Sequence, residues 1–228
     1  MLGRGYFIVF LGPVGVGKST VIRGLARELR ARGFKVYTTF IKAFHGPSYI
    51  VWVLIAKLLG LKFSKFASPW YVIPKSGRLR LARTIFIITT YVDAFLSIPL
   101  KILQVWVFKA LGAYVLSEEC LNVSIPEYIF ALHTMGCTCT KICRIPLRVI
   151  SYFAKRYVPD EIIVLDSSNN TLRERWAMRR EGVPDPIYFA LQRTYILANV
   201  NRTLRINTDH LNINTTIRML LERITLKA

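Results

Sequence analysis

Near the N-terminus, positions 10–20 read FLGPVGVGKST. This run matches the pattern G-x-x-x-x-G-K-[ST], whose glycines let backbone N–H groups curl around an anion. The lysine then reaches the phosphates as a point charge, and the hydroxyl after it is suited to Mg²⁺. We therefore predict binding of ATP and Mg²⁺ here. The residues expected to bind ATP are Gly12, Pro13, Val14, Gly15, Val16, Gly17, Lys18, Ser19 and Thr20.

The residues on both sides of this run support a P-loop. Positions 6–11 are wholly apolar, as in a buried parallel strand, and positions 21–29 repeat apolar residues at helical spacing. A strand, a glycine-rich loop and a helix form the required context, because the N-terminal end of the helix points its positive dipole at the anion. A chance glycine turn before an ordinary helix is the alternative.

Carboxylates at the ends of later apolar runs are the next candidates. Glu118 follows the expected strand 113–116, and Asp166 ends the expected strand 159–166. Open parallel sheets bind ligands at the carboxyl ends of their strands. We therefore expect Ser19, Glu118 and Asp166 to bind Mg²⁺. Glu118 is also a candidate general base, with Asp93 or Asp166 as its substitute. Solvated glutamates that cap a helix are the alternative for Glu118 and Glu119.

Arginines on the expected helix 171–181 are the third group of candidates. Arg175 and Arg179 are four residues apart and share a face, which suits two guanidinium groups that grip one polyphosphate. We predict that Lys18, Glu118, Arg175 and Arg179 are catalytic. The breaker-rich end of segment 171–186 favours a lid-like hinge. A solvated basic helix explains the same spacing equally well.

The elements that must position these residues fit one domain over 1–228. Strands are expected at 6–11, 34–40, 113–116, 159–166 and 203–207, with helices between them, as in right-handed β-α-β units. Region 41–110 is expected to be a helical acceptor-side region, with a basic loop at 62–83.

Within that region, a long apolar helix is expected at 80–110, with a kink at Pro99. Its polar residues recur at helical spacing and gather on one stripe, which favours a helix packed in the core over one that faces lipid. These residues are Asp93, Ser97, Lys101 and Gln104.

Composition limits the classes of partner. The 228 residues are 53% hydrophobic and carry a formal net charge of +19, which attracts nucleotides, nucleic acid or an anionic membrane. Only charge suggests single-stranded nucleic acid, so we do not expect that partner. The chain enters its first strand without a signal peptide, so we expect a cytoplasmic protein. A homodimer and peripheral contact with an anionic membrane both stay open.

A cluster of sulfur and imidazole groups follows the expected helix 125–132. His133, Cys137, Cys139 and Cys143 supply enough ligands for zinc, but their spacing matches no paired C-x-x-C arrangement. Buried or free thiols are therefore favoured over a zinc site.

In this order of elements the chain resembles the thymidylate kinase-like branch of the nucleoside monophosphate kinases. The resemblance implies a three-layer α/β P-loop NTPase fold with a five-stranded parallel sheet flanked by helices. It also implies transfer of the γ-phosphoryl of ATP to a nucleoside monophosphate or related acceptor, with Mg²⁺ on the phosphates. The matching segments are the P-loop, 115–119 with Ser124 and Tyr128, 159–166 with Arg175 and Arg179, and Gln192, Arg193 and Tyr195.

The acceptor side departs from the family. Positions 38–41 read TTFI where the family carries an Arg-Glu-Pro-like contact, Ala94 follows Asp93 where arginine is usual, and a glutamate pair replaces Asp-Arg at 118–119. Each change removes an arginine that would hold a nucleoside monophosphate. The apolar segment 41–116 also suggests a membrane-derived alcohol or phosphate as acceptor. The alternative function is an ATP-binding regulatory or membrane-peripheral module without small-molecule kinase activity.

Overall fold

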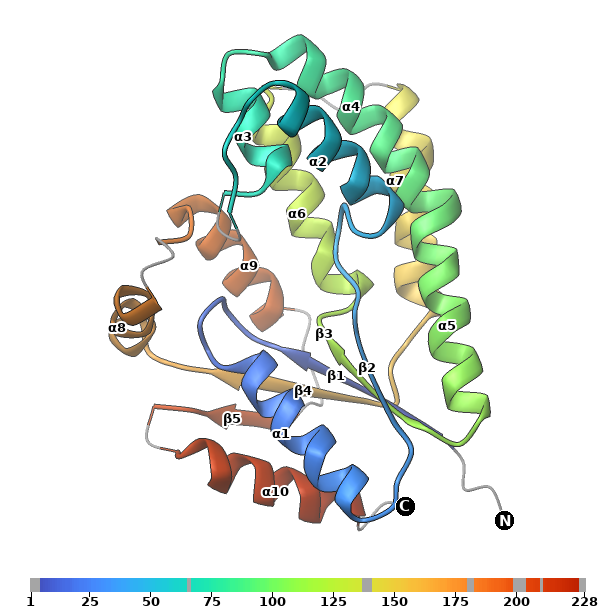
Figure 1. The fold of residues 1–228 in the computed structure, drawn as a ribbon, viewed down its shortest axis with the longest axis vertical. Helices are drawn as coiled ribbons and strands as arrows, with labels where there is room; N and C mark the ends of the chain where they lie inside the picture. The colour runs from blue at the N-terminus through green and yellow to red at the C-terminus, as the bar shows by residue number, and fades with distance from the viewer. Residues whose placement is uncertain are drawn as a thin grey trace.

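A five-stranded, all-parallel sheet in the order β2-β3-β1-β4-β5 forms the centre of the protein (Figure 1). The computed structural model describes residues 5–64, 67–136, 141–179, 183–198, 204–209 and 211–225. The expected α/β fold with this sheet is confirmed. The strands are β1 (Tyr6–Leu11), β2 (Val36–Phe40), β3 (Tyr114–Glu118), β4 (Glu161–Asp166) and β5 (Leu204–Asn207).

Helices cover both faces of the sheet. Helices α1 (Lys18–Ala31) and α10 (Ile213–Thr225) pack together on one face, and α8 (Asn169–Arg179) adds to the same core. The helices of the other side rise above the sheet in Figure 1. They are α2 (Pro47–Leu58), α3 (Pro69–Lys75), α4 (Leu79–Val92), η1 (Asp93–Ser97), α5 (Ile98–Ala110), α6 (Leu121–Thr134), α7 (Lys141–Arg156) and α9 (Pro186–Ala198).

Strand β1 separates two hydrophobic cores. Ile8 and Phe10 face the core of α1 and α10, whereas Phe7, Val9 and Leu11 face the core of the helical side. Because both faces of β1 are buried, its sequence is continuously apolar rather than alternating.

Region 41–110 contains one more helix than expected. The segment expected as a basic loop at 62–83 includes α3, which begins at Pro69 and has Ser68 as its N-cap residue. Proline suits the first turn of a helix because its missing N–H has no partner there in any case. The prediction of a continuous loop was therefore wrong.

The long helical run from Leu79 to Ala110 changes geometry at η1, a π-helix that ends two residues before Pro99. Proline has no N–H to donate to the carbonyl of Phe95 four residues earlier, so the backbone adopts wider turns there. The expected helix is confirmed, and its irregularity lies ahead of Pro99.

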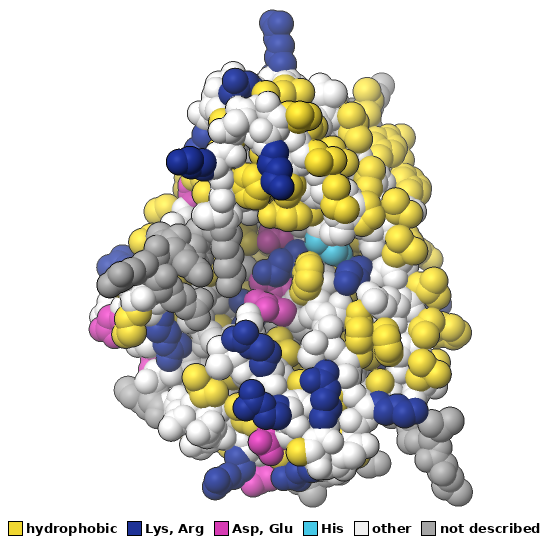
Figure 2. Space-filling model, viewed as in Figure 1, with side chains coloured by type: hydrophobic (Ala, Val, Ile, Leu, Met, Phe, Trp, Pro, Cys, Tyr) yellow, Lys and Arg dark blue, Asp and Glu magenta, His cyan; other side chains and the backbone are white. Residues whose placement is uncertain are grey.

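This run turns its polar side inward. Asp93 and Ser97 are buried, and Lys101 donates to Thr39 Oγ1 at 3.4 Å and to Gln104 Oε1 at 3.3 Å. The outer face is apolar and exposed, and hydrophobic side chains gather along that edge in Figure 2. We call it the apolar stripe: Ile88, Phe95, Leu96, Leu100, Leu103, Trp106 and Leu111. By length and composition the run could cross a membrane, and 44% of its most apolar stretch is buried inside the protein.

Asp93 anchors the segment between β2 and α2. Its carboxylate accepts hydrogen bonds from Phe44 N at 2.8 Å, Tyr128 OH at 2.8 Å and Ser48 Oγ at 2.5 Å. Phe44 has a φ of 50°, which non-glycine residues seldom adopt, so this bond helps to hold an unfavourable backbone. Burial raises the pKa of Asp93 to about 6.

We predict that Asp93 makes the folded state less stable as the pH rises from about 4 to about 6. The unfolded carboxyl ionises near its ordinary pKa of 3.8, whereas the folded one keeps its proton to about pH 6. The free energy of unfolding therefore falls across that interval, by about 3 kcal/mol in total. Urea unfolding of the wild type and of Asp93→Asn across the interval checks this. Parallel pH dependence in the two proteins would contradict it.

Candidate active site

The loop between β1 and α1 has the closed form expected of a P-loop. Gly15 and Gly17 have φ values of 92° and 103°, and Gly17 is the N-cap of α1. A Cβ at Gly15 would lie 2.4 Å from Trp176 Nε1, so a larger residue does not fit. The expected strand, glycine loop and helix are confirmed, with backbone N–H groups of α1 available to an anion.

Lys18 lies in the hollow of this loop. Its Nζ donates to Gly12 O at 2.6 Å and Pro13 O at 3.2 Å, and it is 3.6 Å from Glu119 Oε1. Burial lowers the pKa of Lys18, although the nearby carboxylates oppose the shift. The ammonium is thus held inside the cavity rather than at the surface.

Ser19 and Glu118 meet at the mouth of the loop. Ser19 Oγ donates to Glu118 Oε2 at 2.7 Å. The pairing of β1 with β3 puts Phe10 opposite Glu118, which carries the carboxylate to the P-loop. A hydroxyl and a carboxylate are the oxygen ligands that Mg²⁺ takes beside phosphate oxygens and water. The pair fits that ion.

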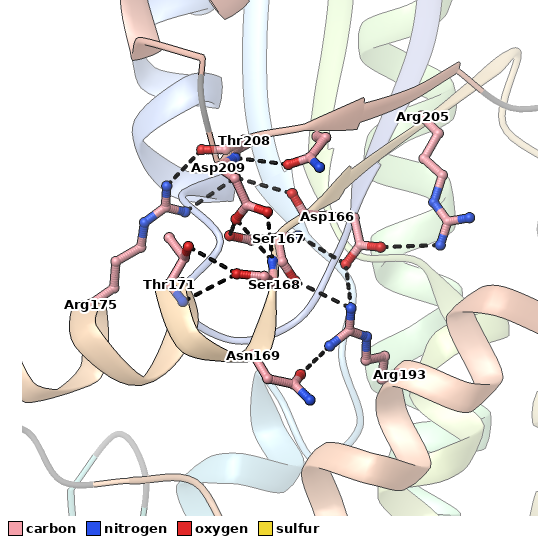
Figure 3. A network of polar contacts seen from close by, with 11 residues as sticks. Asp166, Ser167, Ser168, Asn169, Thr171, Arg175, Arg193, Arg205, Thr208 and Asp209 are labelled. Atoms are coloured by element: carbon pink, nitrogen blue, oxygen red, sulfur yellow. Dashed lines mark hydrogen bonds and ion pairs between the residues drawn. The ribbon is translucent and has the colours of Figure 1, made fainter.

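Asp166 lies in another cluster (Figure 3). Its carboxylate is 3.3 Å from Arg193 Nη2 and 3.1 Å from Arg205 Nη2, and it lines a separate cavity. The described residues that line the cavity of Ser19 and Glu118 do not include Asp166. The structure therefore does not bring Asp166 to the expected metal site, because two guanidinium groups hold it at the β4–β5 side.

Arg175 packs behind the P-loop. Its guanidinium donates to Val16 O at 3.2 Å, Thr208 Oγ1 at 3.1 Å and Thr208 O at 2.8 Å, as Figure 3 shows in part. Trp176 Nε1 donates to Val14 O at 2.9 Å. Helix α8 therefore holds the loop backbone in place. Arg179 ends α8, and its side chain lies outside the described residues.

A cavity of about 580 Å³ runs from the P-loop to helices α3, α6 and α9. Acidic and basic side chains are visible in the central hollow of Figure 2. At the loop end the cavity is lined by Gly15, Lys18, Ser19, Arg23 and Glu118. Glu119 lies between the two ends, since its Oε1 is close to both Lys18 Nζ and Lys42 Nζ. The other end is lined by Lys42, Phe44, His45, Trp70, Tyr71, Glu127, Phe130, Asp185 and Tyr188.

Two buried carboxylates and one lysine are the main polar groups beyond the loop end. Glu127 accepts from Ala43 N at 2.8 Å and from Tyr188 OH at 2.9 Å, and burial together with Glu119 raises its pKa. Lys42 Nζ is 3.3 Å from Glu119 Oε1. Burial opposes the charged form of Lys42, but the carboxylates outweigh burial and raise its pKa.

His45 is a neutral side chain in the same wall. Burial lowers the pKa of its imidazole to about 4, and Nδ1 contacts Lys42 O. The imidazole therefore adds no positive charge to the cavity at neutral pH.

Several lining residues were not among the predicted site residues. Lys42, Glu127 and Tyr188 carry no motif, and only the position of Lys42 just after β2 could have indicated it. Asp93, expected as a substitute carboxylate, is not among the described lining residues and anchors Phe44 instead.

The zinc hypothesis falls partly outside the described residues, because Cys137 and Cys139 lie in the undescribed segment. Cys143 is buried on α7, whereas His133 is on α6. Among the described residues, no group of three or more His, Cys, Asp or Glu side chains is arranged to hold a metal ion.

No family model matches this chain. Among solved structures, the chain is similar to thymidylate kinase from Candida albicans, with a TM-score of 0.57 and 12% identity. The match covers 98% of this chain and 92% of that chain. At this identity the likeness shows the fold, which is that of a P-loop NTPase of the thymidylate kinase type.

We predict that Arg175→Ala lowers the free energy of unfolding by about 1–3 kcal/mol in the absence of nucleotide, because the hydrogen bonds to Val16 and Thr208 are lost. Urea unfolding measures this. Arg173→Ala, an exposed arginine on the same helix, is the matched control. Equal stability of the two variants would show that Arg175 does not hold the loop.

Proposed function

We propose that this protein is an ATP-dependent phosphotransferase that transfers the γ-phosphoryl of ATP to a nucleoside monophosphate or related acceptor. One observation carries the proposal: the Lys18 ammonium and the Ser19–Glu118 pair share one cavity that extends beyond the P-loop to Tyr188. The thymidylate kinase-type fold supports it. A passive nucleotide site needs no second compartment of this kind.

The loop residues Gly12–Thr20 bind the ATP phosphates in this proposal, and Lys18 neutralises charge on the transferring group. Ser19 and Glu118 hold Mg²⁺, which when bound neutralises the phosphate oxygens. The γ-phosphorus gains a bond to the acceptor oxygen and loses its bond to the bridging oxygen, so ADP leaves. Arg179 remains a proposed contact of the transferring group.

Arg175 takes a different role from the one expected. Because its described hydrogen bonds go to Val16 and Thr208, we assign it to positioning the P-loop. Segment 171–186 stays a proposed lid and 41–110 the proposed acceptor side of one domain over 1–228. The protein is proposed to act in the cytoplasm.

The alternative is a regulatory or membrane-peripheral module that binds ATP without small-molecule kinase activity. The exposed apolar stripe favours it, since a docked module needs such a surface. The two functions predict different results in one assay. ADP release stimulated by an added acceptor supports the kinase, whereas tight ATP binding without stimulation supports the module.

We predict that Lys18→Ala abolishes ATP binding or turnover with little change in fold. Lys18 is the single lysine of the loop 12–20, so the variant removes the ammonium group that would contact the phosphates. Calorimetry with ATP and an ADP-release assay measure the loss, and circular dichroism checks the fold. Lys57→Ala, on the exposed face of α2, is the control. Normal turnover by Lys18→Ala would overturn the assignment of the loop.

We also propose that a partner covers the apolar stripe, either a second copy of this chain or an anionic membrane. Trp106 is 63% exposed and Leu103 is 53% exposed, although both are large and apolar. Contiguous apolar surface of this kind is typical of interaction sites. The net charge of +19 favours the membrane by attraction to anionic lipid.

We predict that the double variant Leu103→Ser and Trp106→Ser loses this partner without loss of ATP binding. If the partner is a second copy, sedimentation shows a dimer that dissociates in the variant. If it is a membrane, the wild type floats with vesicles of phosphatidylcholine and phosphatidylglycerol and the variant does not. Val158→Ser, exposed but outside the stripe, is the control. A wild-type monomer that ignores vesicles would contradict both partners.

A further inference from the structure

Aromatic rings form a packed wall at the far end of the cavity. The ring centroids of Phe44 and Trp70 are 5.7 Å apart, those of Trp70 and Phe130 are 6.0 Å apart, and Phe130 is 5.2 Å from Tyr188. Tyr71 stacks on Phe130 at 5.9 Å with an interplanar angle of 17°. Because the rings hold one another, the wall is already formed and suits a flat ring of a ligand.

The charges beside this wall are mainly negative. Glu119 is 2% exposed and Glu127 is 8% exposed, and both line the cavity with Asp185. Among the described residues that line this end, Lys42 is the single lysine. Its ammonium group already forms an ion pair with Glu119. Glu119 lies between Lys42 and Lys18, which offset its charge, and burial raises the pKa of Glu127 to about 7, so this carboxyl is partly ionised at neutral pH. Among the described residues at this end, a phosphate monoester dianion would therefore find no unpaired lysine and would be repelled by Glu127 in its ionised form.

One carboxylate oxygen beside this wall lies between two ammonium groups. Glu119 Oε1 is buried, 3.3 Å from Lys42 Nζ and 3.6 Å from Lys18 Nζ. An acceptor-only carboxylate is matched by a donor such as a ligand hydroxyl or a ring N–H. The phosphate group of a monoester dianion offers no such donor, so the donor must come from a hydroxyl or a ring N–H of the ligand.

The backbone at Glu119 is held in an unfavourable conformation. Its φ is 69°, in the left-handed region that favours glycine, yet the residue is a glutamate. Its N–H donates to Phe10 O at 3.0 Å and its carbonyl accepts from Ser117 Oγ at 2.8 Å, which fixes the turn. Such strain persists where the surroundings impose it, most often at functional sites. The turn directs the carboxylate into the cavity.

We propose that the acceptor is an uncharged alcohol that carries a flat ring, of which a nucleoside is the model, and that Glu119 and Glu127 exclude phosphate monoesters. This inference rests on the proposed phosphotransferase function and selects a related, uncharged acceptor in place of the nucleoside monophosphate. The acceptor hydroxyl oxygen forms the new bond to the γ-phosphorus, the bond from that phosphorus to the bridging oxygen breaks, and ADP leaves. The hydroxyl proton is released, finally to solvent.

The first experiment compares binding without requiring turnover. Thymidine, uridine, adenosine and guanosine, and their 5′-monophosphates, are titrated by calorimetry into protein saturated with MgADP. We expect at least one nucleoside to bind at least about tenfold more tightly than its monophosphate. Equal or tighter binding of every monophosphate, or no binding of any nucleoside, overturns the proposal.

The same panel in an ADP-release assay with MgATP separates the two proposals. Stimulation by a nucleoside supports both. Nucleoside binding without stimulation keeps the acceptor class and removes the phosphotransferase function. Stimulation by monophosphates with no response to nucleosides keeps the phosphotransferase function and removes the acceptor class.

Two variants test the excluding carboxylates. Glu119→Gln and Glu127→Gln keep the shape of each side chain and remove its charge, so each should shift the preference toward the monophosphate by about tenfold. Glu28→Gln, on the exposed face of α1, is the control and should leave the ratio unchanged. An unchanged ratio in both cavity variants contradicts exclusion by charge. Two positions are tested because either variant alone could fail to fold.

Discussion

The parallel pairing of β1 with β3 is the constraint on which the site depends. It sets Phe10 opposite Glu118, so the chain leaves β1 as the P-loop just where β3 delivers its carboxylates. Ser19 on the first turn of α1 then meets Glu118 at 2.7 Å. A register shift of one residue would turn Glu118 to the other face of the sheet, because side chains alternate along a strand. Sheet pairing therefore decides which carboxylate reaches the phosphate-binding loop.

The loop itself is held from behind by elements that are distant in sequence. Arg175 and Trp176 of α8 donate to the carbonyls of Val16 and Val14, and Arg175 also reaches Thr208 after β5. These two main-chain carbonyls therefore have hydrogen-bond partners within the protein, which fixes the backbone of the loop. Arg175 has the helical spacing that suits polyphosphate binding, but its described hydrogen bonds go to the P-loop backbone and to Thr208.

On the helical side of the fold, polar side chains are buried while large apolar side chains are exposed. The run from α4 to α5 turns Asp93 and Ser97 inward, where Asp93 fixes the strained Phe44 that forms part of the cavity wall. The same run leaves its apolar stripe exposed. The cavity beside it combines packed aromatic rings with the buried carboxylates of Glu119 and Glu127. In this run of helices, polar side chains therefore lie in the interior, whereas the apolar stripe lies at the surface.

Local pattern alone determined the strand, P-loop and helix at the N-terminus and the parallel α/β class, because glycine spacing and apolar runs depend on neighbouring residues only. The sequence also placed Glu118 at a strand end. Only the tertiary structure decided that Glu118 meets Ser19, that Asp166 is held by Arg193 and Arg205, and that Glu127 enters the cavity. These outcomes depend on strand order and helix packing, which join residues far apart in the chain and leave no periodic signal in it.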